Sequence, residues 1–375
     1  MNANHFAIPR FGFGCMRLPL LDPKDQKSID MPQFKQMVDA FLEAGGTYFD
    51  TAYVYHEGAS ETALREALVE RYPRDAYQIA TKNPASMFDS AEKARACFDE
   101  SFSRLGVDYV DFYLLHNLGA ERTAKFDEYG MWEFISEKKA EGAIRNIGFS
   151  LHDNPDVLEE LLTAHPEVDF VQLQVNYLDW DDPVIQSRAL LEVAANHGKP
   201  VIIMDPVRGG RLAELPERAA APLRAVDPDA GMASWAYRFC WNLPNVITVL
   251  SGASTIDQMR ENAASFKANR PFSDAERAAL DEALDALRAV PIIPCTNCGY
   301  CLKGCPKQVA IPIIMMLLNL ETMTGNGAFS KHNYQWQAEP GKASDCIQCG
   351  SCEVTCPQGI PIIEHLRDAV RKYEG

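Results

Sequence analysis

The sequence predicts an α/β protein: a closed (β/α)8 TIM barrel over residues 1–290, followed by a small α-helical domain over residues 291–375. Through the first part, eight short apolar runs alternate with longer amphipathic stretches, which is typical of parallel strands linked by helices. No G-x-G-x-x-G sequence follows the first run, as a dinucleotide-binding open sheet would require. Eight of the 11 cysteines lie in the last 81 residues, which indicates that the second part has a chemistry of its own.

The predicted strands are short apolar runs rich in β-branched and aromatic residues, and they span residues 12–18, 48–52, 77–82, 110–116, 144–150, 170–177, 201–206 and 246–252. The predicted helices carry apolar residues at helical spacing and span residues 31–44, 60–71, 91–105, 131–141, 155–164, 183–197 and 232–241, with further helical sequence over 255–289. In the second part, the apolar sequence of residues 313–323 predicts one more helix. Eight βα units within about 290 residues favour a closed barrel over an open doubly wound sheet.

The chain of 375 residues is acidic, with 52 Asp+Glu against 36 Lys+Arg. Because residues 291–375 hold 7 of each, the net charge of −16 falls on the first 290 residues. Without a basic patch, such a surface repels phosphodiester backbones and anionic membranes, so we expect no nucleic acid and no membrane as partners. The longest apolar run, 309–318, is about half the roughly 20 residues of a membrane span. Residues 1–10 show no export signal, so we expect a cytoplasmic protein.

Four polar residues stand at or just after the ends of predicted strands: Asp50, Tyr55, Lys82 and His116. Barrels of this class place their active groups at the C-terminal ends of the strands. A tyrosine phenol has a pKa near about 10, so a neighbouring cation is needed to stabilise the phenolate. Lys82 would supply that charge, Asp50 would hold the ammonium, and His116 would orient a carbonyl oxygen. Taken singly, each residue also has a structural explanation as a loop aromatic, a strand end, a cap or a rim histidine.

The sequence around these residues resembles the aldo-keto reductase family, and the resemblance runs over residues 10 to 270. It is carried by the stretches 49–55 (FDTAYVY), 79–82 (IATK), 111–116 (DFYLLH) and 142–150 (GAIRNIGFS). The resemblance implies that the four residues form the family's catalytic tetrad. It further implies hydride transfer between a nicotinamide and a small-molecule carbonyl or alcohol substrate, with Tyr55 as general acid or base.

The resemblance also implies a set of nicotinamide-cofactor contacts. They are Ser150 and Gln174 for the carboxamide, Gly209, Gly210, Arg211 and Leu212 for the pyrophosphate, and Glu261 and Asn262 for the adenosine. Some positions depart from the family pattern: Leu151 replaces an asparagine, and Met204 replaces a tyrosine that stacks on the ring. Gly252 and Gln258 stand where NADPH-preferring members carry Lys and Arg. Because no evident pair of cations clamps a 2′-phosphate, we expect NADH rather than NADPH.

The cysteines of the second part form the same motif twice, C-x2-C-x2-C-x3-C-P. The two runs are Cys295, Cys298, Cys301 and Cys305, and Cys346, Cys349, Cys352 and Cys356. Three cysteines at this spacing suit a 4Fe-4S cubane, whereas zinc sites use two separated pairs and disulfides seldom persist in a reducing compartment. Zinc and disulfides are the alternatives.

The two runs resemble two-cluster ferredoxins, and in particular the helical ferredoxin-like domain appended to a subset of aldo-keto reductases. In such dicluster domains the fourth cysteine of each run ligates the other cluster. The resemblance therefore implies two 4Fe-4S clusters with exchanged ligands. One would be held by Cys295, Cys298, Cys301 and Cys356, and the other by Cys346, Cys349, Cys352 and Cys305.

Three functions follow from combining such a domain with a hydride-transfer site. The first is an NAD(P)H-dependent carbonyl reductase or alcohol dehydrogenase whose clusters are structural or redox-sensing. The second is a reductase whose clusters, fed by an electron-transfer partner, reduce a substrate in the barrel without obligatory nicotinamide. The third is a redox-sensing binding protein with an inactive barrel, against which the intact tetrad argues. We favour the first.

Overall fold

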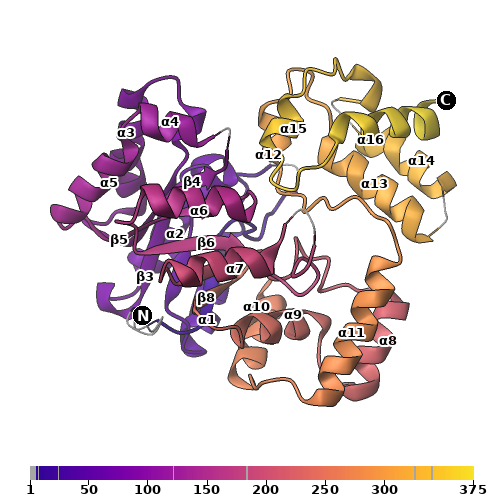
Figure 1. The fold of residues 1–375 in the computed structure, drawn as a ribbon, viewed down its shortest axis with the longest axis horizontal. Coiled ribbons are helices and arrows are strands. Elements are labelled where there is room, and N and C mark those ends of the chain that lie inside the picture. The colour runs from indigo at the N-terminus through magenta and orange to yellow at the C-terminus, as the bar shows by residue number, and fades with distance from the viewer. Residues whose placement is uncertain are drawn as a thin grey trace. The chain divides into compact units, whose positions relative to one another are not determined.

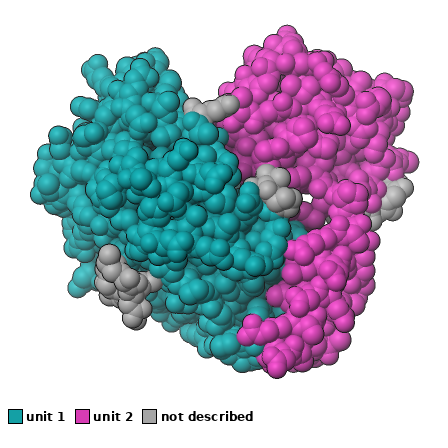
Figure 2. All heavy atoms as spheres, in the orientation of Figure 1, with its two compact units in different colours: residues 1–207, 230–272 teal, residues 208–229, 273–375 magenta. Residues whose placement is uncertain are grey.

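The computed structural model describes residues 6, 8–23, 25–120, 122–182, 185–324, 327–338 and 341–375. Its chain divides into two compact units, coloured separately in Figure 2. The first comprises Met1–Val207 and Ala230–Phe272, and the second comprises Arg208–Asp229 and Ser273–Gly375. A domain boundary at residue 290 stays a prediction. None of the helices in the described ranges is both long and apolar enough to cross a membrane.

Eight parallel strands form the centre of the first unit, and they close into a barrel in chain order (Figure 1). They are β1 (Phe11–Gly14), β2 (Tyr48–Asp50), β3 (Gln78–Asn83), β4 (Val110–Leu118), β5 (Ile144–Leu151), β6 (Phe170–Gln174), β7 (Val201–Met204) and β8 (Val246–Ser251). The pairing of Phe13 with Ser251 is part of the register that closes the ring between β1 and β8. All eight predicted strands are present, and the predicted barrel is confirmed.

The alternation of side chains along each strand sorts the barrel interior into an apolar and a polar part. Side chains two residues apart point to the same face of a strand. Tyr48, Ala80, Phe112 and Phe170 belong to one buried apolar cluster with other inward-facing residues. Asp50, Lys82 and Gln172 come two residues after Tyr48, Ala80 and Phe170. His116 comes four residues after Phe112. The polar residues therefore gather at one end of the interior.

The helices of the first unit surround the strands (Figure 1). They are α1 (Met31–Glu43), α2 (Ala59–Leu64), α3 (Ala91–Leu105), α4 (Thr123–Glu128), α5 (Met131–Ala140), α6 (Pro155–Ala164), α7 (Ser187–Asn196), α9 (Met232–Trp241) and α10 (Ile256–Lys267). Several begin at a side-chain cap, such as Asp30 before α1 and Ser90 before α3, because the cap satisfies a free backbone N–H. Of the helix predicted over 183–197, residues 183 and 184 lie outside the described residues.

The second unit is helical in its described part, apart from an isolated bridge between Val309 and Gly341. Its helices are α8 (Glu217–Val226), α11 (Asp274–Arg288), α12 (Tyr300–Lys303), α13 (Ile311–Thr324), α14 (Gly327–Gln337), α15 (Ser351–Thr355) and α16 (Ile362–Ala369). Ile314, Leu317, Tyr334 and Leu366 lie in its own apolar core.

Within residues 1–290, two helices and one interruption differ from the sequence expectation. Helices α4 and α8 were not predicted, and α8 carries Pro222 in its interior, which ordinarily argues against a helix. The helical sequence over 255–289 is divided into α10 and α11. Pro271 lies in the break, and Ser273 caps α11 by a reciprocal bond with Glu276.

Candidate active site

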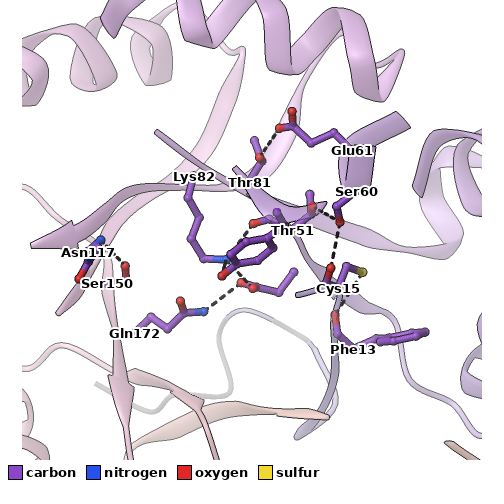
Figure 3. A network of polar contacts seen from close by, with 12 residues as sticks. Phe13, Cys15, Thr51, Ser60, Glu61, Thr81, Lys82, Asn117, Ser150 and Gln172 are labelled. Atoms are coloured by element: carbon purple, nitrogen blue, oxygen red, sulfur yellow. Dashed lines mark hydrogen bonds and ion pairs between the residues drawn. The ribbon is translucent and has the colours of Figure 1, made fainter. Parts of the chain in front are cut away.

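The ammonium group of Lys82 occupies the centre of a buried polar network (Figure 3). Its Nζ donates to Asp50 Oδ1 at 2.5 Å, to the carbonyl oxygen of Thr51 at 2.8 Å and to Tyr55 Oη at 3.2 Å. These three bonds use the three N–H donors of an ammonium. Lys82 is fully buried, and Asp50 is 2% exposed. The geometry thus fixes the cation against both the carboxylate and the phenol.

Asp50 has a partner at each carboxylate oxygen. Oδ1 accepts from Lys82, and Oδ2 accepts from Gln172 Nε2 at 2.9 Å. Burial raises the pKa of Asp50, while the charge of Lys82 and the bonds from Lys82 and Gln172 lower it. Burial also lowers the pKa of Lys82, and Asp50 opposes that shift. The attraction between the two charges therefore opposes the effect of burial on both pKa values.

A left-handed turn positions Tyr55 after the end of β2. His56, Glu57 and Gly58 all have positive φ, at 51°, 52° and 90°. The imidazole of His56 fixes the turn because its Nε2 accepts from the backbone N–H of Leu18 at 3.0 Å and its Nδ1 lies 2.9 Å from the carbonyl oxygen of Gln26. Nδ1 must then carry the proton, so His56 is neutral, and burial lowers its pKa. Tyr55 is held at the end of the barrel by this turn.

The phenol of Tyr55 keeps its proton at neutral pH. Burial raises its pKa well above the ordinary value, the carboxylate of Asp50 adds to this rise, and Arg17 opposes it. The Tyr55 ring meets the imidazole of His116 edge to face, with ring centroids 5.7 Å apart and planes at 81°. A protonated phenol beside an ammonium is suited to donate a proton and to be stabilised once it has done so.

The predicted carboxamide contacts lie at the ends of β5 and β6. Ser150 Oγ accepts from the backbone N–H of Asn117 at 2.8 Å and is 2% exposed. Gln174 Nε2 donates to Asp179 Oδ2 at 2.7 Å, which fixes its orientation. Gln174 lies two residues after Gln172, on the same face of β6, and Ser150 pairs with Gln172 in the register of β5 and β6. Both therefore face the interior.

The other predicted cofactor residues fall into two places. Asn262, on α10, donates to Ser251 Oγ at 3.0 Å and is 6% exposed, and the carboxylate of neighbouring Glu261 lies against Gly231. Gly209, Gly210, Arg211 and Leu212 belong to the second unit. The structure therefore does not gather all the predicted cofactor residues in one compact unit.

The eight clustered cysteines line two separate hollows. The first is lined by Cys295, Cys298, Cys301 and Cys356, and the second by Cys305, Cys346, Cys349 and Cys352. The fourth cysteine of each run lies in the hollow of the other run. Among the residues that the structure describes, no three His, Cys, Asp or Glu side chains converge on a single ion. Four thiols around an apolar hollow fit a cubane, whose irons are spread over several ångströms.

Comparison with known proteins identifies both parts of the chain. The model of the aldo/keto reductase family matches residues 10–285. The chain belongs to the aldo/keto reductase family. In this aldo/keto reductase, a second model, the 4Fe-4S dicluster domain, matches residues 294–361. It is thus an oxidoreductase with an aldo/keto reductase barrel and a C-terminal ferredoxin domain.

Individual relatives share the barrel of this aldo/keto reductase. It is 28% identical over 293 residues to "Uncharacterized oxidoreductase YqkF" of Bacillus subtilis, covering 70% of this chain and 89% of the relative. It is 26% identical over 298 residues to "NADH-specific methylglyoxal reductase" of Escherichia coli, covering 67% and 88%. Among solved structures, the holo form of an aldo-keto reductase from Bacillus halodurans aligns with a TM-score of 0.59 and 28% identity, over 74% of this chain and 92% of that one.

Three residues of this aldo/keto reductase were missed by the sequence analysis. Gln172 bonds Asp50, and its place two residues after inward-facing Phe170 could have revealed it. Asn117 follows His116 at φ 63°, and its buried Oδ1 has no hydrogen-bond partner among the described residues. The guanidinium of Arg17 lies 3.9 Å from where a Cβ on Gly252 would stand. Neither Asn117 nor Arg17 carries a local sequence signal for this placement.

Proposed function

We propose that this aldo/keto reductase reduces a small aldehyde or ketone, with Tyr55 as the general acid. A bound nicotinamide supplies the hydride, which goes to the carbonyl carbon. Tyr55 donates its proton to the carbonyl oxygen, the C=O bond becomes C–O–H, and the phenolate is reprotonated from solvent. The observation that carries the proposal is the 3.2 Å contact between Lys82 Nζ and Tyr55 Oη.

Each partner of Tyr55 has a distinct part in the proposed reaction. The ammonium of Lys82 stabilises the phenolate left after proton transfer, and a buried charge pair acts strongly there because little water screens it. Asp50 keeps Lys82 charged and in place. His116, whose ring meets that of Tyr55 edge to face, orients the carbonyl oxygen toward the phenol.

Cofactor contacts are assigned to the residues that the family pattern implies: Ser150, Gln174, Gly209, Gly210, Arg211, Leu212, Glu261 and Asn262. We further propose NADH as the preferred reductant. Gly252 and Gln258 offer no cation for a 2′-phosphate, and the Escherichia coli relative is named NADH-specific. The guanidinium of Arg17 lies beside Gly252, one of the two positions compared for the 2′-phosphate. The assay therefore measures both NADH and NADPH.

Two 4Fe-4S clusters are proposed for the second unit, with the exchanged ligand sets described above. This proposal is supported by the two cysteine-lined hollows. A cytoplasmic location remains part of the proposal as well, as expected for a chain whose clusters and free thiols need a reducing compartment.

The proposed acid is tested by Tyr55→Phe in anaerobically purified protein, with methylglyoxal and a panel of small aldehydes and ketones as substrates. We expect kcat to fall about 10²- to 10⁴-fold, since one positioned acid contributes about that much, while the Kd for nicotinamide stays the same. Tyr53→Phe is the matched control because its hydroxyl bonds Glu100 rather than Lys82. Wild-type kcat in Tyr55→Phe would refute the assignment.

A further inference from the structure

The loop proposed to bind the cofactor phosphates touches the first cysteine run inside the second unit. Gly209 has φ +66°, and a Cβ added to it would lie 2.5 Å from the carbonyl oxygen of Thr296 and 3.0 Å from the Thr296 carbonyl carbon and Cα. Thr296 stands between Cys295 and Cys298. The two backbones are therefore in direct contact, although 87 positions separate them in the chain.

This contact is tight and local. All three nearest atoms belong to the backbone of Thr296, so no flexible side chain can move aside. Thr296 and Arg208 are each 5% exposed, and Leu212 is fully buried. Gly210 also has a positive φ, +95°, but nothing lies within 4 Å of its Cβ position. Of the two glycines, Gly209 is the one whose Cβ position meets the cysteine run.

The cysteine run that Gly209 touches lines the first hollow. Cys295, Thr296, Cys298 and Gly299 line it together, and Cys356 closes it from the other run. A cluster bound by Cys295 and Cys298 would fix the backbone on both sides of Thr296, because metal–thiolate bonds hold their ligands in one geometry. Without these bonds, the short segment 295–299 has no regular secondary structure to hold it.

We propose that the iron-sulfur cluster of the first hollow supports the loop of residues 209–212 in the conformation that receives the phosphates of the nicotinamide cofactor. The inference rests on the proposed function. It gives the cluster a role that requires no electron transfer to the hydride site: loss of the cluster, for example by oxidation, weakens cofactor binding. Neither Thr296 nor residues 209–212 line the hollow of Cys346 and Cys349, so the proposal concerns the first cluster alone.

The first test removes one cluster at a time. Cys298→Ser and Cys349→Ser are compared with the wild-type holoprotein for the Kd of NADH and NADPH and for cleavage by trypsin after Arg208 and Arg211. We expect Cys298→Ser to weaken the Kd about tenfold or more and to speed cleavage, and Cys349→Ser to have a clearly smaller effect on both. Equal effects of the two variants, or none in Cys298→Ser, would overturn the proposal.

A second pair of variants leaves all the proposed cluster ligands unchanged. Gly209→Ala and Gly210→Ala both introduce a side chain at positive φ, at a similar backbone cost. Only Gly209→Ala adds a collision with Thr296. We expect faster tryptic cleavage after Arg208 and Arg211 in Gly209→Ala than in Gly210→Ala, and identical cleavage would contradict the contact. If the wild-type holoprotein binds neither NADH nor NADPH, the proposed function fails, whereas the cleavage comparison still decides whether the cluster supports the loop.

Discussion

Gln172 donates a hydrogen bond from Nε2 to Asp50 Oδ2 at 2.9 Å, across the interior of the barrel from β6 to β2. Both residues are almost completely buried, at 1% and 2% exposed. With Oδ1 bonded to Lys82, neither oxygen of the carboxylate is left without a donor. Gln172 thereby positions Asp50 and, through it, the ammonium that faces Tyr55.

Gln172→Leu should therefore change how activity depends on pH. Loss of the donor leaves a buried carboxylate oxygen unpaired, at a cost of about 1–3 kcal/mol, and raises the pKa of Asp50. We expect the acid limb of kcat/KM to move to higher pH. Thr248→Val is the control, since the buried Oγ1 of Thr248 has no hydrogen-bond partner among the described residues. An acid limb that coincides with that of the wild type would show that Gln172 does not act through Asp50.

The two directions of the reaction should respond differently to alkaline pH. In the proposed reaction, reduction needs the protonated phenol of Tyr55, and burial raises its pKa well above the ordinary value. Reduction should hence stay level through the neutral range and fall only when the pH exceeds about 10, while alcohol oxidation, which needs the phenolate, should rise with pH. Initial rates in both directions measure this. A reduction rate that already falls between about pH 7 and about pH 9 would contradict a buried phenolic acid.

The proposed exchange of cysteine ligands predicts which double substitutions act on one cluster. Cys301 and Cys356 line the same hollow, so the double variant Cys301→Ser/Cys356→Ser should retain about half of the iron. Cys301 and Cys305 line different hollows, so Cys301→Ser/Cys305→Ser should lose nearly all of it, although the two residues are close in sequence. Iron and sulfide analysis checks both, with Cys97→Ala as control. The reverse result would mean that each run binds its own cluster.

The barrel should lose stability in mild acid because of His152. Burial, together with the charge of Arg122, lowers the pKa of His152 to about 3, and its Nδ1 has no hydrogen-bond partner among the described residues. In the unfolded chain a histidine has a pKa of about 6.5. Below that pH the unfolded state therefore binds a proton that the folded state does not bind.

The contribution of His152 to stability is therefore present above pH 6.5 and is lost as the pH falls toward 3. His152→Leu should reduce the dependence of the unfolding free energy on pH by about one proton over this window. Urea unfolding followed by tryptophan fluorescence, at several pH values between these limits, measures the slope. An unchanged slope in the variant would mean that His152 is solvated in the folded protein.

Much of the barrel and of the candidate site could be predicted from the sequence because the evidence is local. Each strand is a short apolar run, and Asp50, Lys82 and His116 occupy strand ends, so closing the barrel necessarily brings them to one end. The bond from Gln172 to Asp50 joins residues 122 positions apart and depends on the register of several intervening strands, which no local pattern specifies.

By itself, the sequence determined the kinds of chemistry in this protein: a lysine and a tyrosine at barrel strand ends, and two runs of cysteines at cubane spacing. Only the tertiary structure decided which groups meet. It gave Asp50 its second partner and brought Gly209 against Thr296. The physical reason is that periodicity and spacing report interactions between near neighbours in the chain, whereas these contacts arise from packing segments that are distant in sequence.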